Sequence, residues 1–279
     1  MAEIGKNNTL TIVKTVDFGV YLNGDEDGEI LLPRRYVPEG AKPGDTLEVF
    51  LYFDSEDRLI ATTEKPLARV GEFAFLRAVA VNPTGAFLDW GLPKDLLVPF
   101  SEQRPPMRAG NKYVVFVYLD VASRRIVASA KIDKHLSKLP PPFHPGQEVD
   151  LLIYGKTDLG YKAVVDNTHG GILYLNEVFR DLGPGERVKG YIRKIRDDGK
   201  IDLRLDKLGQ AAVGELAERI LAALKANDGF LDVNDKTPAD RIGRLFGTSK
   251  NAFKMAVGTL YKKRLIVIDE FGITLADQL

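Results

Sequence analysis

The dominant pattern in the sequence is a set of short apolar or alternating segments that recurs three times. Alternating apolar and polar residues indicate half-buried strands, and the glycine, proline and aspartate clusters between them indicate turns. Five such segments in so short a stretch are more typical of a small closed barrel than of a sandwich. The threefold recurrence therefore predicts three small closed barrels in tandem. The expected strands are 9–16, 18–22, 29–33, 46–53 and 59–62; then 73–81, 85–90, 95–99, 112–119 and 125–129; then 147–152, 161–165, 171–175, 186–195 and 200–205.

The periodicity changes from that of strands to that of helices after residue 206. Residues 211–225 place apolar side chains at helical spacing and end at Asn227-Asp228-Gly229. A second helix is expected at Thr237-Pro238, with Thr237 as its cap, and a third after Ser249. A hairpin within 265–275 completes the element order of a winged helix.

The predicted fold class is mainly β, with three five-stranded barrels followed by a C-terminal α/β winged-helix domain. The expected domains are residues 1–65, 66–139, 140–207 and 208–279, and the proline-rich stretch 138–143 is a stiff break before the third barrel.

Composition favours a cytosolic protein and no membrane partner. Apolar runs stay well short of the roughly 20 residues that a membrane-spanning helix needs, and the N-terminus lacks the pattern of a signal peptide. The sequence has no cysteine, which excludes disulfides and thiolate metal sites or nucleophiles.

The net charge of zero conceals an uneven distribution along the chain. Residues 1–65 carry seven Lys or Arg against thirteen Asp or Glu, whereas residues 66–139 carry eleven against six. A polyanion responds to the local field, so the second segment is the better electrostatic candidate for one. The alternative is that its cations are ordinary solvated surface. These cations include Arg104, Arg108, Lys112, Arg124 and Arg125.

An aromatic pair brackets the predicted second strand of the first repeat. Phe18 and Tyr21 are three residues apart, so on a regular strand they would point to opposite faces. A twist or bulge near Gly19 would be needed to bring both to one surface. Phe87 and Tyr161 are the corresponding aromatic residues in the second and third repeats. Exposed rings there would stack on bases, and the alternative is that some of them, such as Tyr21, Phe87 or Trp90, fill the barrel.

Phe18-Gly19-Val20-Tyr21-Leu22 resembles the second strand of S1-type RNA-binding modules. Asp54 and Arg58 resemble a further pair of that module, and Asp120 and Arg124 repeat the spacing. The third segment departs from the pattern, since it offers only Asp197 and Lys200, and the module's usual histidine after the third strand is replaced by Pro33, Pro99 and Tyr174. The resemblance implies that the three barrels are S1-like OB folds. It also implies an RNA-binding set of Phe18, Tyr21, Asp54, Arg58, Phe87, Asp120, Arg124 and Tyr161.

The last predicted helix is the clearest basic feature, with no acidic residue between Thr248 and Leu265. In a winged helix such an element contacts phosphates, so Lys250, Lys254, Lys262 and Lys263 are candidate nucleic-acid contacts. The alternative is a structural or protein-docking winged helix. The segments 249–254, 258–263 and 272–275 resemble the C-terminal signature of the bacterial conserved virulence factor B family. That similarity extends over essentially the whole chain and implies RNA binding with regulatory consequences.

Enzyme chemistry has no support in the sequence. His135, His144 and His169 are scattered, without carboxylates or other histidines at ligand spacing, so we expect no catalytic residue, metal or cofactor. The sequence predicts a non-catalytic, cytosolic regulator of gene expression that binds single-stranded RNA. The alternatives are a protein-interaction scaffold on the ribosome or transcription machinery, favoured by the acidic first barrel and irregular third one, or DNA binding by the winged helix.

Overall fold

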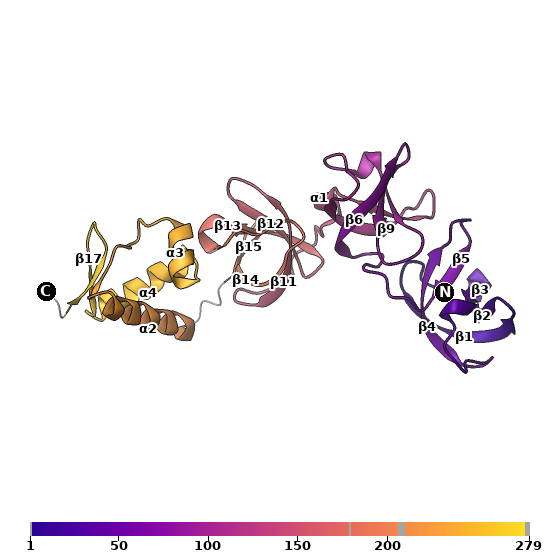
Figure 1. Cartoon of the computed structure of the whole chain (residues 1–279), viewed down its shortest axis with the longest axis horizontal. Helices are drawn as coiled ribbons and strands as arrows, with labels where there is room; N and C mark the ends of the chain where they lie inside the picture. The colour runs from indigo at the N-terminus through magenta and orange to yellow at the C-terminus, as the bar shows by residue number, and fades with distance from the viewer. Residues whose placement is uncertain (1, 179, 206–209, 277–279) are drawn as a thin grey trace. The chain divides into compact units, whose positions relative to one another are not determined.

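The computed structural model describes residues 2–178, 180–205 and 210–276, and within them the chain forms three closed five-stranded barrels and a winged-helix domain (Figure 1). The predicted fold class is confirmed. The first barrel contains β1 (Asn7–Val16), β2 (Gly19–Asn23), β3 (Glu29–Pro33), β4 (Thr46–Phe53) and β5 (Leu59–Thr62). The second contains β6 (Phe73–Asn82), β7 (Gly85–Asp89), β8 (Leu96–Pro99), β9 (Lys112–Leu119) and β10 (Ile126–Ser129). The third contains β11 (Glu148–Lys156), β12 (Gly160–Val165), β13 (His169–Tyr174), β14 (Arg187–Ile195) and β15 (Ile201–Arg204).

All three barrels share one strand order. In the first barrel it is β1-β2-β3-β5-β4, closed by antiparallel pairing of β1 with β4, and β3 runs parallel to β5. This is the order of an OB fold. Alternate apolar side chains such as Leu22, Leu32 and Leu51 point inward and are fully buried. A short 3-10 turn follows the third strand of each barrel: η2 (Arg34–Tyr36), η3 (Phe100–Glu102) and η4 (Leu175–Glu177).

The first two barrels form one compact unit, Met1–His135, which ends in the short helix α1 (Ile132–His135). Phe50 and Tyr52 of β4 belong to the same apolar cluster as Trp90 and Leu96 of the second barrel. The rings of Phe50 and Trp90 meet edge to face with their centroids 5.8 Å apart. Trp90 therefore joins the two barrels and is not an exposed stacking ring.

The third barrel and the winged helix form the other unit, Leu136–Leu279. The winged helix contains α2 (Gln210–Ala226), β16 (Phe230–Leu231), α3 (Ala239–Phe246), α4 (Lys250–Lys262), β17 (Ile266–Ile268) and β18 (Ile273–Leu275), with sheet order β16-β18-β17. The side chain of Ser249 caps α4 by accepting a hydrogen bond from the Ala252 amide. Thr237 does not cap α3, because its hydroxyl accepts a hydrogen bond from the Asn234 amide at 2.8 Å. Among the described residues, none of the helices has the length and apolar character to cross a membrane.

Candidate nucleic-acid interface

Phe18 and Tyr21 form a joint aromatic surface on the first barrel. Their ring centroids lie 6.3 Å apart, the ring planes are at 83°, and Phe18 is 58% exposed. The bulge expected near Gly19 lies instead in β1, between Ile12 and Lys14. Phe18 precedes β2 and so escapes the alternation of a strand, which lets its ring meet that of Tyr21.

The glycine at the start of each second strand determines where this surface begins. A Cβ atom on Gly19, Gly85 or Gly160 would lie 2.2 to 2.4 Å from a carbonyl oxygen of the third strand. Only glycine allows that close approach of the backbones. The residue two positions later pairs with the middle of the third strand, and this position holds Tyr21, Phe87 and Lys162 in the three barrels.

Two cations accompany the aromatic pair of the first barrel. The Lys14 ammonium lies 4.6 Å from the centroid of the Tyr21 ring and also pairs with Glu29. The pKa of Arg58 is raised, chiefly by its hydrogen bond to Asp54, and Tyr21 contributes a smaller electrostatic effect. The Lys14 ammonium therefore places positive charge against the aromatic pair, which suits a base and its phosphate.

Asp54 positions Arg58 within the β4–β5 hairpin. Asp54 Oδ1 accepts the backbone amides of Glu56 and Arg58 at 2.9 and 3.0 Å, and Asp54 Oδ2 accepts Arg58 Nε at 2.9 Å. Partial burial alone would raise the pKa of the Asp54 carboxyl, but the hydrogen bonds from Arg58 and Glu56 lower it. Asp54 is thus an ionised anchor for the turn, and Arg58, two-thirds exposed, is the group available to a ligand.

The second barrel differs from the predicted pairing of Asp120 with Arg124. Asp120 accepts hydrogen bonds from the amide and hydroxyl of Ser123, at 2.9 and 2.6 Å. Arg124 lies in the hairpin turn with φ 53°. The backbone of Asp120 pairs with that of Arg125, as that of Asp54 pairs with that of Arg58, so Arg125 is the structural counterpart of Arg58.

The sequence contains a signal that could have identified Arg125. The β4–β5 loop spans 54–58, whereas the β9–β10 loop spans 120–125 and is one residue longer. An alignment from the aspartate forward selects Arg124. An alignment backward from the fifth strand of each barrel selects the arginine directly before that strand. This residue is Arg58 before Leu59 in the first barrel and Arg125 before Ile126 in the second.

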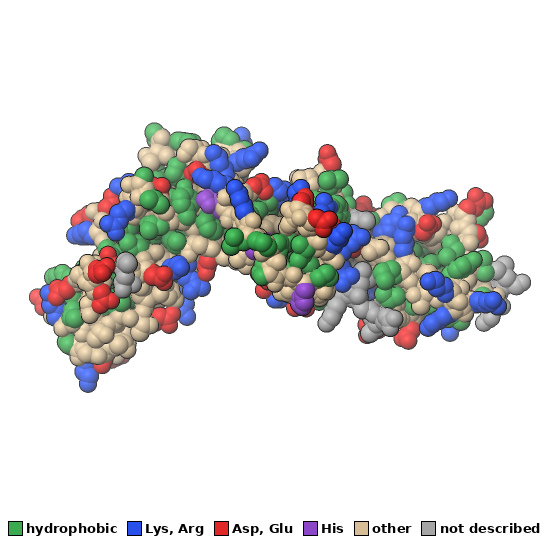
Figure 2. Space-filling view, turned by 180° about the vertical axis from the view of Figure 1, so that it is seen from behind, with side chains coloured by type: hydrophobic (Ala, Val, Ile, Leu, Met, Phe, Trp, Pro, Cys, Tyr) green, Lys and Arg blue, Asp and Glu red, His purple; other side chains and the backbone are tan. Residues whose placement is uncertain are grey.

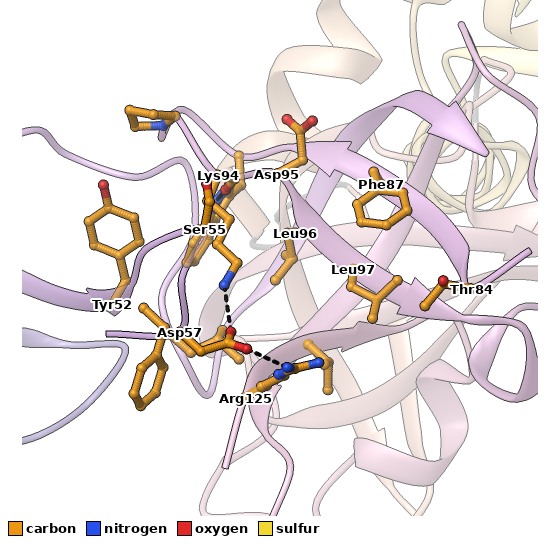
Figure 3. A pocket seen from close by; sticks show the side chains of 15 residues that line it. Tyr52, Ser55, Asp57, Thr84, Phe87, Lys94, Asp95, Leu96, Leu97 and Arg125 are labelled. Carbon is orange, nitrogen blue, oxygen red and sulfur yellow. Dashed lines mark hydrogen bonds and ion pairs between the residues drawn. The ribbon is translucent and has the colours of Figure 1, made fainter. Parts of the chain in front are cut away.

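Arg125 forms an ion pair with a carboxylate of the first barrel. Its guanidinium pairs with Asp57 Oδ2, and Lys94 Nζ lies 3.0 Å from Asp57 Oδ1 (Figure 3). Hydrogen bonds from Lys94 and Arg125 lower the pKa of the Asp57 carboxyl. Phe87 is half-buried and lines the same pocket as Arg125 and Asp57. Sequence analysis did not identify Asp57 or Lys94, because neither is part of the repeated pattern.

Tyr161 does not lie on the exposed surface that the predicted stacking on RNA requires. Tyr161 follows Gly160 directly, so it occupies the inward position of Val20 and Ala86, and it is only 2% exposed. Its hydroxyl donates to Asp181 at 2.8 Å. A ring enclosed by the barrel cannot stack on a base. The position of Tyr21 is taken by Lys162, whose ammonium lies 5.0 Å from the centroid of Tyr154.

The third barrel also replaces the acid and arginine of the hairpin. Arg196 and Lys200 are joined by the backbone hydrogen bond that joins Asp54 and Arg58 in the first barrel. Arg196 pairs with Asp202 at 2.9 Å and contacts the hydroxyl of Tyr174. Asp197 is a residue of the turn and not the counterpart of Asp54.

The lysines of α4 differ in their accessibility. Lys254, Lys262 and Lys263 are exposed, whereas Lys250 is half-buried at the start of the helix. The helix contacts η4 of the third barrel, where Asn251 Nδ2 donates to Glu177 Oε1 at 3.2 Å. The N-terminal turn of α4 is therefore engaged by the barrel, and its C-terminal half carries the accessible cations.

Charge on the surface follows the sequence distribution. On the face shown in Figure 2, acidic side chains gather over the first barrel, at the left, and lysine and arginine side chains are more frequent over the second. The first barrel thus combines its aromatic surface with an acidic background.

Comparison with known proteins identifies two domain families in the chain. The S1 domain family matches residues 4–64, which is the first barrel. The CvfB-like winged helix domain family matches residues 218–275.

Similarity to relatives extends over nearly the whole chain. A Bacillus subtilis strain 168 protein, described as uncharacterized protein YitL, is 32% identical over 272 residues, which cover 92% of this chain and 89% of the relative. Conserved virulence factor B of Staphylococcus aureus strain RF122 is 26% identical over 250 residues, covering 83% and 80% of the two chains. A crystal structure of a multidomain protein with nucleic acid binding domains from Streptococcus pneumoniae TIGR4 covers 98% of both chains, with 24% identity and a TM-score of 0.42.

Proposed function

Because the chain belongs to the conserved virulence factor B family, we propose that it is a non-catalytic RNA-binding protein that regulates gene expression through single-stranded RNA. Its domains are of types that bind nucleic acids, an S1 barrel and a winged helix.

The exposed pair of Phe18 and Tyr21 carries this proposal. A ring that is 58% exposed on an OB barrel has lost much of the benefit of burial, and stacking on a base restores it. Stacking requires an unpaired base, since bases in a duplex cover one another. Lys14 supplies positive charge beside the rings, and Arg58 adds an exposed cation to a barrel that is otherwise acidic. The expected ligand is therefore a single strand whose bases are accessible.

The winged helix adds phosphate contacts from the C-terminal half of α4. Its N-terminal turn contacts Glu177 of the third barrel through Asn251, which opposes entry of that turn into the major groove of a duplex. This contact favours binding of a single strand along the exposed lysines of α4 over insertion of α4 into duplex DNA. Linkage of these contacts to the barrels within one chain raises the overall avidity.

A protein-interaction scaffold is the competing function, favoured by the acidic surface of the first barrel. Salt distinguishes the two functions. RNA binding through Arg and Lys weakens as salt rises, because counterions are released from the phosphates, whereas an apolar docking interface responds little.

Fluorescence anisotropy of a labelled single-stranded RNA dodecamer tests the proposal. Each stacked base contributes about 1–3 kcal/mol, so the double variant Phe18→Ala/Tyr21→Ala should bind at least tenfold more weakly. Phe271→Ala, which removes a 73%-exposed ring from the turn between β17 and β18, is the matched control and should bind normally. Equal affinity of the double variant and the wild type would refute the proposal.

A further inference from the structure

A cleft of about 450 Å³ lies between the first two barrels. Its volume falls within the range of roughly 300–1,000 Å³ that is usual for small-molecule sites. Phe87 and Leu97 line it from β7 and β8 of the second barrel, and Tyr52 and Phe53 line it from β4 of the first. The shared apolar cluster that contains Phe50 and Trp90 holds the barrels together beside it, so the cleft exists without a ligand.

Two cations converge on a single carboxylate in this cleft. Figure 3 shows Lys94 and Arg125 reaching Asp57 from two sides. Lys94 Nζ also donates to the backbone carbonyl of Asp54 at 2.6 Å. Both cations belong to the second barrel, and Asp57 belongs to the first. Asp57 thus occupies the position that an anionic ligand of the second barrel would take.

The ion pairs are accessible to solvent and therefore exchangeable. The side chains of Arg125, Asp57 and Lys94 are 55%, 45% and 33% exposed. Pairs this exposed contribute little net stability, because water solvates the separated charges well. A phosphate offers Arg125 a bidentate partner with more negative charge than one carboxylate.

An aromatic platform lies in the same cleft. Phe87 occupies the position of Tyr21 in the first barrel, and its neighbour across the strands is Leu97. Figure 3 shows Phe87, Leu97 and Thr84 together on one side of the cleft and the Asp57 network on the other side. A flat base fits against such a surface, and its phosphate would reach the two cations.

We propose that this cleft binds one unpaired nucleotide, with its base on Phe87 and its phosphate on Lys94 and Arg125, in exchange for the carboxylate of Asp57. The ligand chemistry is that of a nucleoside monophosphate, either free or as one unit of an RNA strand. In the second case the inference rests on the proposed function, and the site is a second contact apart from Phe18 and Tyr21. Asp57 then acts as an internal competitor that sets the affinity of the cleft.

Trp90 is a built-in reporter for the test. It is the only tryptophan of the sequence, and it lines the cleft. Its fluorescence is followed while the full-length chain is titrated with uridine or adenosine 5′-monophosphate and, in a second arm, with a single-stranded RNA dodecamer. Saturable quenching by both ligands indicates a site for nucleotides in general, and quenching by the RNA alone assigns the site to a strand. Absence of a response to either ligand overturns the proposal.

Two substitutions with opposite expected effects on ligand affinity distinguish ligand exchange from a purely structural ion pair. Arg125→Ala should weaken binding at least tenfold, whereas Asp57→Asn, which keeps the shape of the side chain, should strengthen it severalfold. If the pair only joins the barrels, both variants should change affinity in the same direction or leave it unchanged, and either result overturns the proposal. Circular dichroism verifies folding, and Phe87→Leu, which keeps an apolar side chain, should independently weaken binding.

Matched controls are available in the same unit. Arg69 Nε lies 3.0 Å from Glu72 Oε1 in a solvent-accessible pair that does not line the cleft, so Arg69→Ala and Glu72→Gln should bind as the wild type does. The double variant Phe18→Ala/Tyr21→Ala should keep the response to mononucleotide while losing affinity for RNA. If the wild type fails to bind mononucleotide but binds RNA through Phe18 and Tyr21, the cleft proposal is wrong. If it binds mononucleotide but the double variant keeps its full affinity for RNA, the proposed surface on the first barrel is wrong.

Discussion

Arg58 and Arg125 occupy the same position in the first and second barrels, but each binds a different carboxylate. Arg58 binds Asp54 of its own hairpin, with 2.9 Å between Nε and Oδ2. Arg125 binds Asp57 of the neighbouring barrel. The first arginine is thus held ready at an exposed surface, and the second is engaged between two barrels. The same residue type at the same position therefore lies in two different environments.

Charge changes around Arg58 should alter RNA affinity in opposite directions. Arg58→Ala should weaken binding of single-stranded RNA about three- to tenfold and reduce the slope of log affinity against log salt by about 0.7, because one phosphate contact is lost. Glu56→Gln should strengthen binding slightly, since Glu56 Oε2 lies 2.9 Å from Arg58 Nη1 and competes for it. Anisotropy titrations at several salt concentrations measure both effects. An unchanged salt slope for Arg58→Ala would remove Arg58 from the interface.

Two glycines of the third barrel should differ sharply in their tolerance of alanine. A Cβ atom at Gly160 would lie 2.2 Å from the Leu173 carbonyl oxygen, so Gly160→Ala should destabilise the barrel by about 1–3 kcal/mol. Gly155 is also in a strand of this barrel, but a Cβ atom there meets nothing within 4 Å. Gly155→Ala should be neutral or stabilising by about 0.5 kcal/mol. Urea unfolding measures both, and equal effects would contradict the close approach of β12 and β13.

The small contribution of the exposed Asp57 ion pairs to the link between the first two barrels should be lost in acid. Lys94 and Arg125 lower the pKa of Asp57 from its ordinary value of 3.8, so the folded state favours the ionised carboxylate. A group with a depressed pKa contributes its full stability above the ordinary value and loses it as the pH falls through the folded-state pKa. Trp90 emission and thermal unfolding of the wild type should therefore change below pH 3.8 by more than those of Asp57→Asn. Identical pH profiles would show that the ion pairs add nothing to the interface.

The exposed lysines of α4 should contribute to RNA binding without base preference. The double variant Lys254→Ala/Lys262→Ala should weaken binding of different RNA sequences by a similar factor and reduce the salt slope by about 1.4, since two phosphate contacts are lost. Lys225 and Lys236 are exposed elsewhere on the winged helix. Their double alanine variant is the control and should have little effect. An equal loss in both variants would indicate a general charge effect and not an interface on α4.

Element identity was predictable because it depends on neighbours in the sequence. Alternation along β4 and the capping of α4 by Ser249 are local, so strands and helices were placed correctly to within a few residues. The four-residue helix α1 and the two-residue strand β16 were not predicted. The strand depends on pairing with β18, whose residues are distant in the sequence. Thr237 was misassigned as a cap because its hydroxyl had a second local partner, the Asn234 amide.

Side-chain direction was predictable only in part. The joint surface of Phe18 and Tyr21 follows from the strand beginning at Gly19, one residue later than the pattern indicated. Tyr161 was assigned to this surface by similarity of composition, yet it stands one position from Gly160, where Tyr21 stands two from Gly19. A shift of one residue on a strand moves a side chain from the outer face to the core.

The amino-acid sequence alone determined three barrels, a winged helix and an aromatic surface, because periodicity and turn chemistry are properties of contiguous residues. Tertiary structure decided which arginine serves the second barrel, the burial of Trp90 against Phe50, and the meeting of Asp57 with Lys94 and Arg125. Asp57 is 37 residues from Lys94 and 68 residues from Arg125 in the sequence, so no local pattern encodes these ion pairs. They arise only when two separately closed barrels pack into one unit.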